Sequence, residues 1–167
     1  MENKEIEKNK ITIEFLQINL HHSILAMENL TGMILKSNYS KEKNVKKIIL
    51  AQEPYMGHGK LKGPPGMTVI KSKETGKVRS CIFIDKNLSC WLLTQFSHDD
   101  FVTIGIKTDI GTVIVSSMYL PYDRQEGPVD PNMIELINTC KENKWELILG
   151  GDTNCHHTAW NSSGING

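Results

Sequence analysis

Residues 147–157 read Leu-Ile-Leu-Gly-Gly-Asp-Thr-Asn-Cys-His-His and hold the residue types best suited to chemistry. The apolar run predicts a buried strand that ends in polar residues. Asp152 and Asn154 are two residues apart, so an extended backbone would place both side chains on one face. A carboxylate beside an amide supplies a base and a hydrogen-bond donor that can hold a nucleophile or a phosphate. The alternative is an Asx-type turn after the strand, because the same residues favour turns.

Three other predicted strands also end in polar residues. The first ends at Gln17, Asn19 and His21, the second at Glu53 and the third at Tyr119. Each residue alone has a simpler explanation: Asn19 would cap the next helix, Glu53 would be a solvated loop acid, and Tyr119 would be a half-buried strand residue. The recurrence of the pattern at four strand ends favours one shared cleft.

The hydrophobic pattern predicts the elements that would position these residues. Strands are predicted over 11–19, 45–51, 67–71, 79–84, 89–95, 101–107, 112–119 and 145–149. Helices are predicted over 22–36 and 131–143, with loops over 38–44, 52–66 and 120–130. This order predicts an α/β fold in which two packed mixed β-sheets are flanked by helices. Residues 1–10 are charged and aperiodic and are expected to form a disordered tail before one domain over 11–167.

The amino-acid composition limits the classes of function that the chain could have. The 167 residues carry 19 basic and 19 acidic side chains, so no global basic field indicates nucleic acid, although a metal could supply local positive charge. The four cysteines form no Cys-x-x-Cys pair, which favours a reduced intracellular protein in the nucleus or the cytoplasm. No signal-peptide pattern and no apolar run of roughly 18 residues is present, so no membrane association is expected. Nothing in the sequence indicates an obligate protein partner.

Four motifs follow one another along the chain: Gln-Ile-Asn-Leu-His-His, Gln-Glu-Pro-Tyr, Ser-x-Tyr-Leu-Pro and Gly-Gly-Asp-Thr-Asn-x-His-His-x-x-Trp. Together they resemble the endonuclease/exonuclease/phosphatase superfamily of DNase I-like proteins. The nearest resemblance is to the apurinic-endonuclease-type endonuclease domain of non-LTR retrotransposons. It runs from about residue 11 onward and implies a four-layer α/β sandwich, incomplete at the C-terminus. The implied function is a phosphodiesterase that nicks target DNA to prime reverse transcription by an RNA-directed DNA polymerase.

The resemblance implies a role for five residues. Glu53 matches the acid that binds the metal, and Asn19 matches the amide beside the metal and the scissile phosphate. Asp152 matches the residue that orients or deprotonates the attacking water. Asn154 matches the amide that holds the phosphate or that aspartate, and Tyr119 matches the phenol that contacts the phosphate. The implied cofactor is Mg²⁺, with Mn²⁺ as the alternative, because a hard cation binds oxygen ligands and retains several waters.

Three histidines are further candidates for contact with the phosphate or the substrate DNA. His21 stands where relatives of the apurinic-endonuclease type carry an aspartate. His156 and His157 follow the last motif. A different interpretation is a zinc module built from His21, His22, Cys155, His156 and His157, but no paired Cys or His spacing supports a closed tetrahedral site.

The chain departs from the superfamily pattern near its C-terminus. No Ser-Asp-His-type motif follows Asp152, although relatives use that motif for a second acid and a transition-state histidine. Trp160 is followed by Asn161 where the retrotransposon group typically carries glycine, and residues 161–167 are loop-like. We therefore expect a truncated domain with weak or no activity. The alternative is a non-catalytic remnant that keeps the fold or binds nucleic acid weakly.

Overall fold

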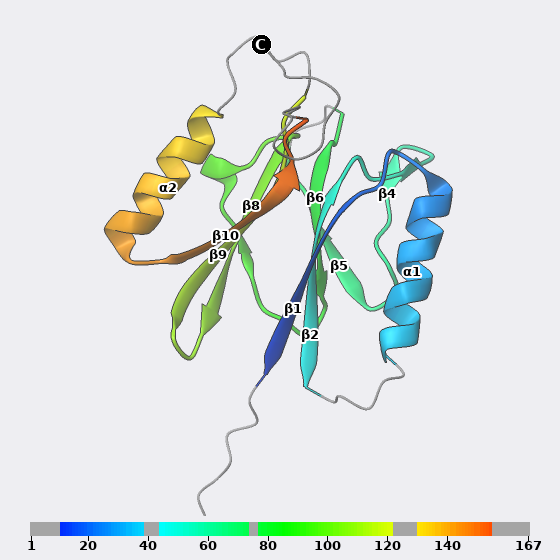
Figure 1. Ribbon diagram of the computed structural model, residues 1–167, viewed down its shortest axis with the longest axis horizontal. Helices are drawn as coiled ribbons and strands as arrows, with labels where there is room; N and C mark the ends of the chain where they lie inside the picture. Colours follow the sequence, from blue (N-terminus) through cyan, green and yellow to red (C-terminus); the bar gives the residue numbers. More distant parts are fainter. Residues whose placement is uncertain (1–10, 39–43, 74–76, 122–129, 155–167) are drawn as a thin grey trace, which may run out of the picture.

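A computed structural model describes residues 11–38, 44–73, 77–121 and 130–154. Two four-stranded sheets pack face to face, and one helix covers the outer surface of each (Figure 1). The predicted two-sheet α/β architecture with flanking helices is confirmed. The predictions for residues 1–10 and 155–167 lie outside the described residues.

The first sheet has the strand order β1-β2-β6-β5. Its strands are β1 (Thr12–Asn19), β2 (Val45–Gln52), β5 (Met67–Ile70) and β6 (Ser80–Asp85). Helix α1 (Ile24–Asn38) connects the parallel strands β1 and β2. The prediction of an unbroken loop over 52–66 was wrong, because β3 (Met56–Gly57) and β4 (Lys60–Leu61) form a short hairpin there. Strands of two residues are too short to produce a periodic pattern.

The second sheet has the order β10-β9-β8-β7. Its strands are β7 (Trp91–Leu92), β8 (Phe101–Thr108), β9 (Gly111–Tyr119) and β10 (Glu146–Asp152). Helix α2 (Pro131–Asn143) connects the parallel strands β9 and β10. The strand predicted over 89–95 is largely wrong, because β7 gives way to the 3₁₀ turn η1 (Thr94–Phe96). Leu93 and Phe96 are both buried, and this spacing of three fits a turn better than a strand.

Strand β2 shows how the sequence fills the layers. Ile48 and Leu50 face the second sheet, whereas Ile49 and Ala51 face α1, as the two-residue period of a strand requires. Its continuous apolar run follows from burial on both faces. The apolar layer between the sheets comprises Ile48, Leu50, Ile82, Ile84, Val102, Ile104, Ile106 and Val115, none more than 3% exposed.

The starts of both helices are fixed by side chains. The Ser23 hydroxyl accepts a hydrogen bond from the Ala26 amide at 3.2 Å near the start of α1. Asp130 caps α2 by accepting from the Asn132 amide at 2.9 Å, with Pro131 in the first turn as predicted. No helix in the described ranges is long and apolar enough to span a bilayer.

Candidate active site

The two parallel strand pairs end at the same edge of the molecule. In the first sheet Asn19 stands opposite Gln52, and in the second Asp152 stands opposite Tyr119. Asn19 Nδ2 donates a hydrogen bond to Asp152 Oδ2 at 2.6 Å across the two sheets. Asn19 Oδ1 accepts from the His21 amide at 2.8 Å. Asn19 therefore links the two sheets, whereas Ser23 supplies the side-chain bond at the start of α1.

Two glycines allow β10 to approach its neighbours closely enough for this link. A Cβ on Gly151 would lie 2.2 Å from the Met118 carbonyl oxygen, and a Cβ on Gly150 would lie 2.7 Å from Leu50 Cδ1. Both separations are shorter than any normal contact. The Gly-Gly pair before Asp152 is thus a packing requirement that brings the end of β10 against β9 and β2.

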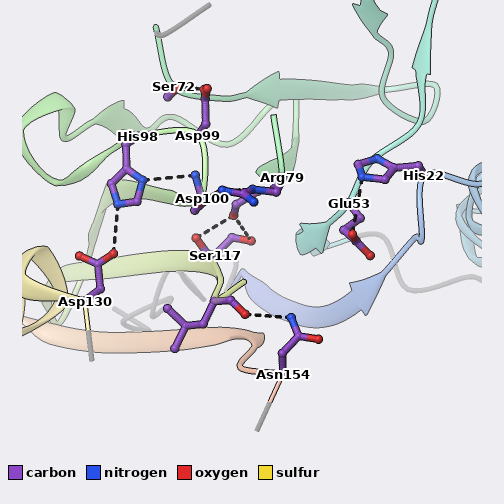
Figure 2. Close-up of polar contacts among 12 residues, drawn as sticks. His22, Glu53, Ser72, Arg79, His98, Asp99, Asp100, Ser117, Asp130 and Asn154 are labelled. Atoms are coloured by element: carbon purple, nitrogen blue, oxygen red, sulfur yellow. Dashed lines mark hydrogen bonds and ion pairs between the residues drawn. The ribbon is translucent and has the colours of Figure 1, made fainter. Parts of the chain in front are cut away.

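Asp152 and Asn154 meet through a turn, and the prediction of a shared strand face was wrong. Strand β10 ends at Asp152, and Asn154 has a left-handed φ of 48°. The Asn154 amide donates to Asp152 Oδ1 at 2.9 Å. Asn154 Nδ2 donates to the Leu120 carbonyl at 2.8 Å, the bond drawn at Asn154 in Figure 2. The Asx-type turn is confirmed, and it brings Asn154 to the end of β9 next to Tyr119.

The Tyr119 phenol lies among the predicted polar residues. Burial raises its pKa most, and a hydrogen bond from Asn154 lowers it. The negative charge of Glu53, a hydrogen bond to Glu53 and the negative charge of Asp152 raise the pKa further. The phenol is therefore neutral at neutral pH and can donate a hydrogen bond. These interactions place Tyr119, Glu53, Asp152 and Asn154 at one point.

Glu53 is not a solvated loop acid. Its side chain is 18% exposed and lies between two imidazoles: His21 Nδ1 is 3.6 Å from Oε2, and His22 Nε2 is 3.6 Å from Oε1. The Glu53 amide donates to the Arg79 carbonyl at 2.8 Å, which anchors the residue to the start of β6. Figure 2 shows His22 directly beside the Glu53 side chain.

Backbone strain is concentrated at this edge. Six non-glycine residues in the described ranges have a left-handed φ, and four of them, His21, His22, Glu53 and Asn154, belong to the site. Each such residue costs about 1–3 kcal/mol and persists only where its surroundings enforce it. Concentrated strain of this kind is typical of functional sites.

Sequence reasoning missed a cation beside Tyr119. The Arg79 guanidinium lies 5.6 Å from the centre of the Tyr119 ring. It also forms a two-point ion pair with Asp100, at 2.5 Å for each contact, and Figure 2 shows these two residues side by side. The Tyr119 amide in turn donates to the Asp100 carbonyl at 2.8 Å. The only signal in the sequence was a charged residue immediately before the buried run of β6.

A buried polar network joins the two sheets next to the site. Gln52 is fully buried, and its Nε2 donates to Ser117 Oγ at 3.0 Å across the sheets. Gln17 Nε2 donates to Gln52 Oε1 at 2.6 Å, and the Ser80 hydroxyl lies 2.8 Å from the Ser117 carbonyl. Satisfied buried networks of this kind fix one relative position of the elements they join.

The architecture matches that of a solved nuclease domain. Aligned with the endonuclease domain of TRAS1, a telomere-specific non-LTR retrotransposon, the chain gives a TM-score of 0.66 at 26% sequence identity. The alignment covers 91% of this chain and 64% of that domain, so the chain spans less than two thirds of the structure it matches. The chain has a DNase I-like endonuclease fold. No family model matches the sequence, and no curated protein matches it.

A third histidine, His98, lies near the site of this endonuclease fold, and both of its ring nitrogens have partners. His98 Nδ1 accepts from the Asp100 amide at 3.3 Å, and His98 Nε2 lies 3.3 Å from Asp130 Oδ2 (Figure 2). Because both ring nitrogens have partners, His98 joins the segment before β8 to the start of α2 and leaves no nitrogen for a substrate.

Several predicted ligands lie outside the described residues. These are His156 and His157, together with Cys155 of the zinc alternative. Within the described ranges, no group of three or more His, Cys, Asp or Glu side chains is arranged so that it could hold a metal ion. Burial raises the thiol pKa of the three described cysteines, Cys81, Cys90 and Cys140, which keeps them protonated at neutral pH.

Proposed function

We propose that this chain carries the active site of a divalent-cation-dependent phosphodiesterase that nicks DNA, of the type found in non-LTR retrotransposons. The observation that supports the proposal most is the hydrogen bond of Asn19 to Asp152, because it joins two sequence motifs 133 residues apart at the edge that also holds Glu53 and Tyr119. In a complete retroelement, the nick would provide a 3′-hydroxyl that primes reverse transcription.

Asp152 is the proposed base that orients or deprotonates the attacking water. Its Oδ2 accepts from Asn19 and its Oδ1 accepts from the Asn154 amide, so the carboxylate is held in one orientation. The remaining lone pairs can accept a proton from water, which is the geometry that general base catalysis needs. Asn154 contributes through its backbone as well as its side chain.

Tyr119 and Arg79 are the proposed contacts to the phosphate. A neutral phenol donates a hydrogen bond to a phosphate oxygen, and the raised pKa of Tyr119 keeps it in this form. The guanidinium of Arg79 lies over the Tyr119 ring and is ion-paired with Asp100, so a phosphate would share it with that carboxylate. Because Arg79 is paired with Asp100, Glu53 and Asp152 leave the site acidic, so a bound cation would have to supply the positive charge that a polyanionic substrate needs.

Glu53 is the proposed anchor of the divalent cation, Mg²⁺ or Mn²⁺. The residues present fit such an ion, because a partly buried carboxylate lies beside the buried Nε2 atom of His22, which has no hydrogen-bond partner in the described structure. A bound cation would neutralise charge on the phosphoryl oxygens. Asn19 remains the proposed neighbour of the cation. Both atoms of its side-chain amide already have partners, because Nδ2 donates to Asp152 and Oδ1 accepts from the His21 backbone amide.

Plasmid nicking tests the proposal. The purified chain is incubated with supercoiled plasmid and Mg²⁺, Mn²⁺ or EDTA, and conversion to open circle is measured. Asp152→Asn should lower the nicking rate by at least roughly 100-fold, because the base is lost. Asp109→Asn is the matched control, since Asp109 is exposed in the β8–β9 turn. Equal nicking by Asp152→Asn and the wild type would contradict the proposal.

We also propose that turnover by this 167-residue polypeptide is slow, because its sequence contains no Ser-Asp-His motif. The second candidate function, a non-catalytic scaffold that binds DNA weakly, rests on the same observation and on the zero net charge. A cooperatively melting chain that never nicks but shifts duplex DNA at low salt would favour this candidate, since backbone contacts are strongest there.

A further inference from the structure

Positive charge is gathered in the segment that follows β2. Between the acidic residues at positions 53 and 74 the sequence contains no other acid, and its basic or imidazole side chains are His58, Lys60, Lys62, Lys71 and Lys73. The chain as a whole has equal numbers of acidic and basic residues, so this segment is a local exception. Figure 1 shows β4 at the end of the molecule where β10 ends and α1 begins, which is the edge that holds the candidate active site.

The β3–β4 hairpin presents two of these lysines to solvent. Met56 pairs with Leu61, and both side chains pack against the apolar cluster beneath α1. Because neighbouring side chains of an extended chain point to opposite faces, Lys60 and Lys62 project away from that cluster on either side of Leu61. Both lysines are exposed. The apolar residues thus anchor the hairpin, and the lysines form its outer face.

The hairpin is held firmly against the first sheet. A Cβ on Gly63 would lie 2.9 Å from Val69 Cγ2 and 3.1 Å from Phe83 Cδ1, so the chain that leaves β4 packs directly on β5 and β6. At the tip, His58 and Gly59 have φ angles of 50° and 71°, and two positive φ angles are typical of the tight type I′ turn. A surface element that is ordered in advance loses little conformational entropy when it binds a ligand.

The charges of the two lysines are not neutralised by neighbours. Within the described ranges neither Lys60 nor Lys62 forms an ion pair, whereas Lys46 and Lys47 of β2 lie 3.7 Å and 3.2 Å from carboxylate oxygens. Two residues of extended chain span roughly 7 Å. Phosphates of one DNA strand follow every 3.4 Å or so along the helix axis, so two flexible lysine side chains at this spacing can reach neighbouring phosphates.

We propose that Lys60 and Lys62 bind neighbouring phosphates of one strand of duplex DNA and hold that duplex against the active-site edge. Lys60 stands opposite Gly57, which follows Glu53 by four residues, and four residues of chain span at most about 14 Å. The bound phosphates therefore lie within one helical turn, about 34 Å, of the cleaved bond. The inference deepens the proposed function and rests on it for the choice of DNA as the ligand. It makes the hairpin a source of DNA affinity that needs no cation.

DNA binding in EDTA tests the inference without cleavage. Fluorescence anisotropy of a short fluorescein-labelled duplex is measured over a series of salt concentrations. Lys60→Gln/Lys62→Gln should weaken binding at least tenfold at low salt. It should also reduce the slope of log affinity against log salt by roughly two, because each lost phosphate contact removes about 0.9 from it. Lys60→Arg/Lys62→Arg keeps both charges and should bind DNA as the wild type does.

The matched control is Lys36→Gln/Lys141→Gln, which changes the net charge by the same amount. Both lysines are exposed and lie in the last turns of α1 and α2, far from the edge where these helices begin (Figure 1). This variant should keep the wild-type salt slope and lose no more than roughly twofold in affinity. Thermal melting in EDTA identifies any variant that fails to fold. The single variants Lys60→Gln and Lys62→Gln then carry the test, and each should reduce the slope by roughly one.

A wild-type salt slope in a folded Lys60→Gln/Lys62→Gln variant would overturn the inference, and so would equal losses of affinity in this variant and the control. Absence of DNA binding by the wild type at low salt would also overturn it. Cation-dependent nicking alongside any of these results would leave the proposed function standing. A reduced slope in a chain that nicks with neither Mg²⁺ nor Mn²⁺ would support the inference and contradict the phosphodiesterase proposal.

Discussion

Asp152 accepts hydrogen bonds on both carboxylate oxygens, and the donors come from opposite sides. Asn154 approaches through its own turn, whereas Asn19 approaches from the other sheet. Of these two bonds, only the one from Asn19 depends on a side chain distant in sequence. Removing the Asn19 side chain therefore tests how Asp152 is oriented without removing the base itself.

Asn19→Ala should therefore lower nicking by roughly tenfold to a hundredfold, because the carboxylate loses one of its two positioning contacts. Plasmid nicking at saturating cation measures the effect. Asn138→Ala, at an exposed position on α2, is the control and should nick as the wild type does. A wild-type rate for Asn19→Ala would show that the turn alone orients Asp152.

Tyr119 makes stability depend on pH in the alkaline range. Its pKa is higher in the folded chain than the ordinary value near 10, so folding favours the protonated phenol. This contribution is fully present below about pH 10 and is lost as pH rises through the folded pKa. Urea unfolding at pH 8 and pH 11 should show a larger loss for the wild type than for Tyr119→Phe. Equal losses would contradict the burial of this phenol.

At the level of single residues, the motifs identified the acids, amides and phenol of the site but not their partners. Glu53, Tyr119 and Asp152 follow apolar strands, which is a pattern that a sequence displays. His22 and Arg79 act through contacts that span 31 and 40 residues, which follows from their numbers and those of Glu53 and Tyr119. No local pattern encodes such contacts, because the sheet registers and the left-handed turns create them.

Strand β10 depends on a residue without a side chain. Gly151→Ala would place its Cβ against the backbone of Met118, which cannot move without shifting β9. We expect a loss of about 1–3 kcal/mol in the free energy of unfolding, and weaker nicking because Asp152 is displaced. Urea unfolding measures the first effect.

The matched control for Gly151→Ala is Gly32→Ala in α1, where an added Cβ meets nothing within 4 Å. Alanine is the better helix former, so this change should stabilise the chain by up to about 1 kcal/mol. Equal effects of the two substitutions would show that β10 can move away from β9 at little cost.

Elements with a clear hydrophobic periodicity were predicted well, whereas elements of two or three residues were not. The apolar run of β2 and the Pro131 start of α2 lie where the sequence indicates. The strand predicted over 89–95 is reduced to the two residues of β7 before η1 begins, because burial of Leu93 and Phe96 imitates an apolar strand. The predicted strand over 145–149 extends to Asp152, because Gly150 and Gly151 pair with β9 although glycine usually weakens strands.

In the whole molecule, the site belongs to neither sheet alone. Asn19 and Glu53 come from the first sheet, whereas Tyr119, Asp152 and Asn154 come from the second. The Gln52–Ser117 bond and the apolar layer between the sheets hold these two sets together. The resemblance to a nuclease was readable from the order of the motifs, but the sequence alone did not show that the inter-sheet packing assembles them.

The order of the strands makes the molecule divisible. Every strand of the first sheet lies between Thr12 and Asp85, and every strand of the second lies between Trp91 and Asp152. A cut in the five residues between them, 86–90, would give two fragments, each with one sheet, one helix and half of the catalytic constellation. We expect that neither fragment nicks DNA alone. When refolded together, the fragments should re-associate, because this buries the apolar surface between the sheets. Co-elution in size-exclusion chromatography measures this. A cut at 109–110 divides the second sheet itself and should not be complemented.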